Sequence, residues 1–119
     1  MTAVVLDTNI LVAAGFNPSS ASAAIVNAVR EGALALVWNV PTRRETRAVL
    51  EQIPPLEWGA FARLYRDESL YLHEVHPDRF STIPDPADRK FAALAGPRGA
   101  QLVTNDAHQR GVARPLVVD

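Results

Sequence analysis

Four acidic residues are the candidates for chemistry in this chain: Asp7, Glu45, Asp88 and Asp106. Carboxylates brought together repel one another and raise each other's pKa, so such a cluster persists only around a cation. The chain has no cysteine, and its three histidines show no metal-ligand spacing, so the expected cation is hard, Mg²⁺ or Mn²⁺. Such an ion activates a bound water and stabilises charge on phosphate oxygens, and a pair of ions ~3.5–4 Å apart can share the attacking and leaving oxygens. The four acids therefore point to phosphodiester hydrolysis.

Two of these acids follow apolar runs that are typical of buried parallel strands. Residues 3–6 precede Asp7, and residues 101–103 precede the polar cluster that contains Asp106. Ligands of open α/β sheets bind beyond the carboxyl ends of the strands, so parallel central strands would make Asp7 and Asp106 neighbours. Asp and Asn also cap helices and form turns, and this remains the alternative for each cluster taken singly.

Glu45 lies near the start of a helix predicted over residues 39–52, with Pro41 marking the helix start. Thr42 and Glu45 match the capping-box pattern, in which the glutamate folds back onto the backbone. A carboxylate in the first turn of a helix that follows a strand also sits near the carboxyl end of that strand. Spacing alone leaves both roles of Glu45 open.

Asp88 lies in the first turn of a helix predicted from the N-cap Asp85 to a stop at Gly96. It shares a line with Phe91 and Ala92, which is the side expected to face the core. An acid on that side is unusual for a mere surface charge. The helix macrodipole also favours an acid there, by ~0.3–1 kcal/mol, and this is the structural alternative.

The remaining segments continue an alternation of strands and helices. We predict a helix over 20–31 with an apolar stripe at Ala24, Ile25, Ala28 and Val29, a strand over 34–38, a helix over 56–68, a third strand over 70–75 and a final strand over 115–118. The β-α-β order implies parallel strands joined by a right-handed crossover. We therefore expect an α/β/α sandwich with a central, mainly parallel sheet of four to five strands.

Length and composition indicate an ordinary globular protein. The 119 residues are expected to form one domain, residues 1–119. The absence of cysteine fits a reducing compartment, and no secretory signal pattern is seen. No apolar run approaches the ~20 residues that cross a bilayer. These features predict a cytoplasmic protein without membrane contact.

The charge balance restricts how nucleic acid could bind. The formal net charge is −1, whereas proteins that bind nucleic acid over their whole surface are strongly basic. Any such contact must be a local patch, and the candidates are Arg43, Arg44, Arg47, Arg89 and Lys90. Eleven of the twelve basic residues are Arg, which suits phosphate contacts, but a GC-rich genome would produce the same bias.

The acids in this order resemble the PIN-domain nucleases, including VapC-like toxin ribonucleases. The resemblance spans residues 3–118 and rests on Asp7-Thr8-Asn9, on Glu45, on Asp88 in the segment 88–95, and on Thr104-Asn105-Asp106. It implies a Mg²⁺- or Mn²⁺-dependent endoribonuclease, often a homodimer, and in many small bacterial members a toxin neutralised by a cognate antitoxin. No further acid follows Asp106 closely, so one or two metals remain open.

By this resemblance the four acids form the catalytic and metal-binding site. The groups expected to orient these carboxylates are Thr8, Asn9, Asp85, Thr104 and Asn105. A catalytically weak or inactive PIN-like module that binds RNA or protein is the main alternative. A phosphoaspartate protein with Asp7 as acceptor ranks low, because position 9 is Asn where such a phosphatase would have a second Asp.

Overall fold

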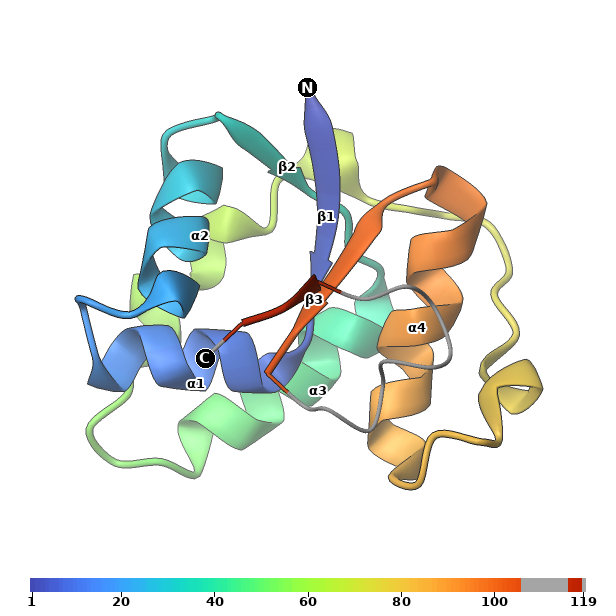
Figure 1. The fold of residues 1–119 in the computed structure, drawn as a ribbon. Helices are drawn as coiled ribbons and strands as arrows, with labels where there is room; N and C mark the ends of the chain where they lie inside the picture. The colour runs from blue at the N-terminus through green and yellow to red at the C-terminus, as the bar shows by residue number, and fades with distance from the viewer. Residues whose placement is uncertain (106–115, 119) are drawn as a thin grey trace.

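The computed structural model describes residues 1–105 and 116–118 (Figure 1). The strands are β1 (Thr2–Leu6), β2 (Leu34–Leu36), β3 (Gln101–Thr104) and β4 (Leu116–Val117), and the α-helices are α1 (Thr8–Phe16), α2 (Ala21–Arg30), α3 (Val40–Glu51) and α4 (Pro86–Arg98). Four short 3₁₀ helices lie between α3 and α4: η1 (Trp58–Ala60), η2 (Ala62–Leu64), η3 (Asp67–Ser69) and η4 (Pro77–Phe80). In the described ranges no single helix is long and apolar enough to cross a membrane; α1 and α2 meet that measure only as a pair bent by 103°.

The strands form one sheet in the order β2-β1-β3-β4, and each neighbouring pair is parallel. Side chains of β1 alternate between two cores: Val4 and Leu6 pack with α1 and α2, whereas Val5 packs with α4. Figure 1 shows the same arrangement, with α1 and α2 on one side of the sheet and α4 on the other. The predicted parallel α/β architecture is confirmed, and β1 lies between β2 and β3.

Helix starts follow local capping chemistry, with one correction. The side chain of Asn39 accepts the Thr42 backbone N–H at 3.0 Å, while the Thr42 hydroxyl accepts the Asn39 N–H at 3.0 Å. This capping box lies one turn earlier than the predicted Thr42–Glu45 pair, because α3 already begins at Val40. Glu45 therefore lies in the second turn of α3 rather than the first, and its carboxylate is not used for capping.

The helix that carries Asp88 runs further than predicted. Asp85 caps α4 as expected, but the helix continues through Gly96 and Pro97 to Arg98. The stop comes at Gly99, whose left-handed conformation at φ 62° closes the helix end. A proline near the last turn removes one backbone donor without ending the helix.

Two predicted elements between α3 and α4 are wrong. The segment 56–68 forms short 3₁₀ helices instead of one α-helix, and the spacing of three between Trp58, Phe61 and Leu64 is compatible with both. Residues 70–75 contribute one bridge, between Leu70 and Trp38, instead of a strand. The chain enters α3 directly after Trp38, so the sheet edge offers one residue for pairing.

The buried face of α2 also differs from the predicted stripe. Ser22, Ala23, Val26 and Val29 are buried, whereas Ala24 is exposed. The alanine-rich sequence of this helix allowed two neighbouring faces, and packing against α1 selected the one that includes Ser22.

Candidate functional site

Asp7 ends the central strand β1 and is 2% exposed. Its carboxylate accepts the hydroxyl of Thr104 and the backbone N–H of Ile10, the latter at 3.3 Å. Its own N–H donates to the carbonyl of Val103 at 3.2 Å. Asp7 therefore caps α1, as the structural alternative predicted, and is held against the end of β3 at the same time.

The polar segments that follow β1 and β3 lie next to each other, as the predicted neighbourhood of Asp7 and Asp106 requires. The side-chain amide of Asn105 donates to the Asn9 carbonyl at 3.5 Å, which joins the residue after β3 to the first turn of α1. Thr8 shares a hydrogen bond of 2.9 Å with Thr46 of α3. Asp106, the fourth predicted acid, lies outside the described residues.

Glu45 projects from α3 toward α4 and is paired with a lysine. The Nζ of Lys90 donates to Oε1 of Glu45 at 3.1 Å, with the two side chains 28% and 23% exposed. The predicted site acid is therefore the partner of a residue predicted to contact RNA.

Asp88 occupies the first turn of α4 and is partly buried. Its backbone N–H donates to the Asp85 carbonyl at 3.1 Å, and the Asp85 side chain accepts the N–H of Ala87 at 3.0 Å. Because α4 runs opposite to β3, which follows it, the start of α4 lies at the carboxyl end of the sheet. Asp85 acts as the N-cap of α4, and it is not one of the four acids predicted to bind the metal.

Asp7 follows β1 and Asp88 lies in the first turn of α4, so both belong to the end of the sheet where β1 ends and α4 begins. Figure 1 shows this end of β1 and the start of α4, and Glu45 is joined to α4 by its ion pair with Lys90. The donors there are carboxylates, hydroxyls and amides, a set that fits a hard divalent cation. Within residues 1–105 and 116–118, however, no three acidic or histidine side chains come close enough together to hold a metal ion. The donor types fit the predicted metal, while the described acids do not by themselves assemble around one point.

The predicted basic patch separates into two groups. Arg43 and Arg47 lie over the Trp58 ring, with 5.5 and 5.7 Å from the guanidinium carbons to the ring centroid, and Arg47 also pairs with Glu51 at 3.3 Å. Arg89 instead donates to the carbonyl of Ile83 at 2.9 Å. Arg43 and Arg47 thus share one side of α3, and Arg44 between them is exposed. The contact of these three residues with RNA remains a prediction.

A buried network behind α3 was missed by the sequence reasoning. Thr46 is fully buried and connects Thr8 to the phenol of Tyr65. Burial raises the pKa of Tyr65 from 10.0 to about 12, against smaller lowering effects of the Thr46 hydrogen bond and the Arg43 charge. The spacing of Thr42, Thr46 and Leu50, which repeats every four residues, was the available indication that these threonines face inward.

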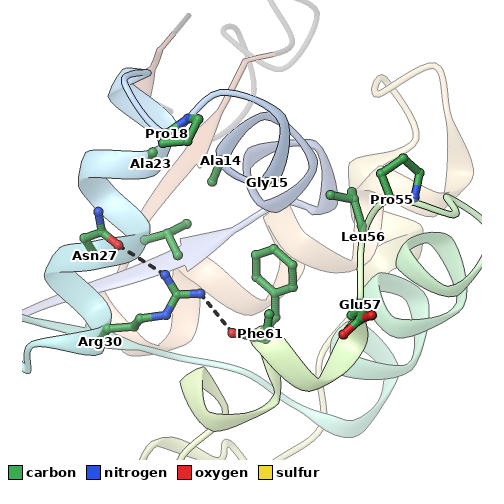
Figure 2. A pocket seen from close by; sticks show the side chains of 12 residues that line it. Ala14, Gly15, Pro18, Ala23, Asn27, Arg30, Pro55, Leu56, Glu57 and Phe61 are labelled. Atoms are coloured by element: carbon green, nitrogen blue, oxygen red, sulfur yellow. Dashed lines mark hydrogen bonds between the residues drawn. The ribbon is translucent and has the colours of Figure 1, made fainter.

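A separate pocket of about 370 Å³ lies between α1, α2 and residues 55–61 (Figure 2). The guanidinium of Arg30 crosses it, donating to Asn27 at 3.1 Å and to the Ala60 carbonyl at 2.9 Å. Gly15 allows the close approach, because a Cβ there would lie 2.5 Å from Leu56. This pocket is at the far end of α1 from Asp7, so it is distinct from the acidic end of the sheet.

A comparison with protein family models identifies the family of this chain. A family model described as the PIN domain matches residues 3–108, which includes Asp7, Glu45 and Asp88. The chain belongs to the PIN domain family. PIN domains are typically nucleases and generally use divalent metal ions. Searches among curated proteins and among solved structures returned no match of significance.

Proposed function

We propose that this PIN domain is a metal-dependent endoribonuclease that hydrolyses RNA phosphodiester bonds. The observation that carries the proposal is Asp7: a carboxylate 2% exposed at the carboxyl end of a central parallel strand, fixed by the Thr104 hydroxyl and the start of α1. Burying an acid at this position costs free energy, which is typical of functional sites.

In this proposal Asp7, Glu45, Asp88 and Asp106 hold Mg²⁺ or Mn²⁺. A divalent ion bound there activates a water and stabilises charge on the scissile phosphate. Thr104 orients Asp7, and the Asn105–Asn9 hydrogen bond keeps the two turns together. Arg43, Arg44 and Arg47 of α3 contact the RNA backbone.

The experiment is the RNA cleavage rate of Asp7→Asn in Mg²⁺ or Mn²⁺. Asn keeps the side-chain shape and can still accept the Ile10 N–H, so the fold should persist, while cleavage falls by more than about 100-fold. Asp67→Asn, which removes an exposed carboxylate in η3, is the matched control and should cleave as the wild type does. Undiminished cleavage by a folded Asp7→Asn protein would refute the proposal.

We further propose that the protein is the toxin of a bacterial toxin–antitoxin pair, acting in the cytoplasm as a homodimer. Expression should then arrest growth, and expression of the neighbouring small reading frame should restore it. Growth unaffected by an enzyme that cleaves RNA in vitro would reject the toxin role and leave the nuclease proposal intact.

The alternative is a PIN-like module that binds RNA or protein with weak or no catalysis. The Glu45–Lys90 ion pair favours it, because this acid is already neutralised at 3.1 Å. RNA binding that is independent of divalent cations, together with no heat of Mn²⁺ binding in calorimetry, would support the alternative over the enzyme.

A further inference from the structure

We propose that Lys90 is a built-in counter-cation for Glu45 that competes with the divalent ion and sets the cation concentration at which the site forms. The inference rests on the proposed function, and it concerns the regulation of the same acidic site. Lys90 then acts through Glu45 and is a positioning residue.

The pair joins two helices that are far apart in sequence. Glu45 belongs to α3 and Lys90 to α4, and their charged atoms lie 3.1 Å apart with about three quarters of each side chain buried. Partly buried charges are screened by solvent and salt less than exposed ones. Any other cation that binds Glu45 must therefore compete with the Lys90 ammonium.

The choice of partner is selective. Arg43, Arg44 and Arg47 lie within two residues of Glu45, yet the ion pair that Arg47 makes is with Glu51, four residues further along. Positions 43 and 47 share one side of the helix, whereas 45 lies on another. The other cation beside Lys90, Arg89, is turned back onto backbone carbonyls.

Lysine suits a replaceable counter-ion. Its ammonium is a compact point charge on a flexible four-carbon stem, whereas an arginine would hold a carboxylate through a rigid fork. A divalent ion bound to Glu45 would face the ammonium at close range, and the two positive charges repel. Cation binding is thus coupled to withdrawal of Lys90, and this lowers cation affinity.

The experiment is Mn²⁺ titration by calorimetry of the full-length wild type, Lys90→Met, Lys90→Arg and Arg47→Met. Lys90→Met keeps the stem without the charge and should bind Mn²⁺ about five- to tenfold more tightly, the effect of removing one nearby charge at high effective dielectric. Lys90→Arg should bind no more tightly than the wild type. Arg47→Met removes the same charge from an exposed pair on α3 and should change the affinity less than twofold.

A second pair of variants tests whether the effect of Lys90 depends on the Glu45 carboxylate. In Glu45→Gln, the additional Lys90→Met substitution should no longer tighten Mn²⁺ binding, because the competitor has lost its target. Circular dichroism melts of each variant establish that the titrated proteins are folded.

The outcomes separate the two proposals. Equal or weaker Mn²⁺ affinity of Lys90→Met relative to wild type would overturn the role of Lys90 and leave the nuclease proposal standing. Tightening of the same size in Arg47→Met would also overturn it, since the effect would then be general electrostatics. Absence of Mn²⁺ binding in every variant would overturn the metal site itself and, with it, the competition.

Discussion

The two best-defined acids of the site are held in different ways. Asp7 is almost fully buried and accepts hydrogen bonds from a hydroxyl and a backbone amide, both neutral donors. Glu45 is about a quarter exposed and is held by the charged ammonium of Lys90. Neutral donors orient a carboxylate while leaving its charge for a cation, whereas an ammonium cancels that charge. The comparison indicates that, in the proposed site, Asp7 is the fixed acid and Glu45 the adjustable one.

Among the residues that hold these two acids, Thr104 gives the largest expected effect, and it tests how Asp7 is fixed. Thr104→Val removes the hydroxyl that donates to Asp7 and should lower both Mn²⁺ affinity and RNA cleavage by about 10–100-fold. The buried oxygen left without this donor should also reduce the free energy of unfolding by about 1–3 kcal/mol. Thr104→Ser keeps the hydroxyl and serves as the control. If Thr104→Val and Thr104→Ser are equally active, Asp7 does not depend on this donor.

The second prediction concerns the basic side of α3. Replacing Arg43, Arg44 and Arg47 together by Gln should weaken RNA binding and flatten the slope of log affinity against log salt by about 2, if each contacts one phosphate of a single strand. Arg63→Gln, an exposed change in η2, controls for the loss of one positive charge away from α3 and should leave the slope unchanged. A salt slope identical to that of the wild type would place the RNA elsewhere.

The two acids also differ in how well their surroundings could be predicted from the sequence. The two apolar strands predicted that Asp7 and Asp106 are neighbours, because the carboxyl ends of parallel central strands meet at one edge of the sheet. The structure places Asp7 against the end of β3, as that argument requires, while Asp106 itself lies outside the described residues. The role of Thr104 in orienting Asp7 was implied by the resemblance to PIN domains. The partner of Glu45 was not predictable, since Lys90 lies 45 residues away and the local capping-box pattern suggested a different use. Asn39 made that capping box instead, and tertiary packing of α3 on α4 chose the pair.

The same limit explains the misread region between α3 and α4. The spacing of Trp58, Phe61 and Leu64 fits a helix or a 3₁₀ segment equally well over a short stretch. The strand expected over 70–75 needed a long edge, and the early start of α3 leaves one residue for it. Local patterns there were correct about burial and wrong about backbone geometry.

A smaller effect on stability is expected when Glu45, the adjustable acid, is replaced. Glu45→Gln should change the free energy of unfolding by no more than about 1 kcal/mol, because the cost of desolvating a mostly buried pair offsets much of its attraction and the flexible Lys90 stem can carry the ammonium to water once its partner is neutral. Urea unfolding of Glu45→Gln and Thr104→Val, compared side by side, measures the difference between the two acids. A larger loss in Glu45→Gln would reverse the assignment of fixed and adjustable acids.

The last effect is confined to alkaline pH and concerns the Tyr65 network, which joins α3 to the start of α1. The pKa of Tyr65 is raised from 10.0 to about 12, so the folded protein keeps this proton above pH 10 while the unfolded chain releases it. The resulting stability is fully present below pH 10 and is lost as the pH rises through about 12. Absorbance titration should show a phenol with a late transition that is absent in Tyr65→Phe; a late transition that persists in that variant would show that the shift does not belong to Tyr65.

The central claim is that the acids at the carboxyl end of the sheet hold a divalent cation. The most direct test is a crystal of the wild-type protein grown in Mn²⁺ and measured for anomalous scattering. We expect a peak within about 2.5 Å of an Asp7 carboxylate oxygen, with Glu45 turned toward it and away from Lys90. Clear density for Asp7 with no such peak at saturating Mn²⁺ would contradict the claim.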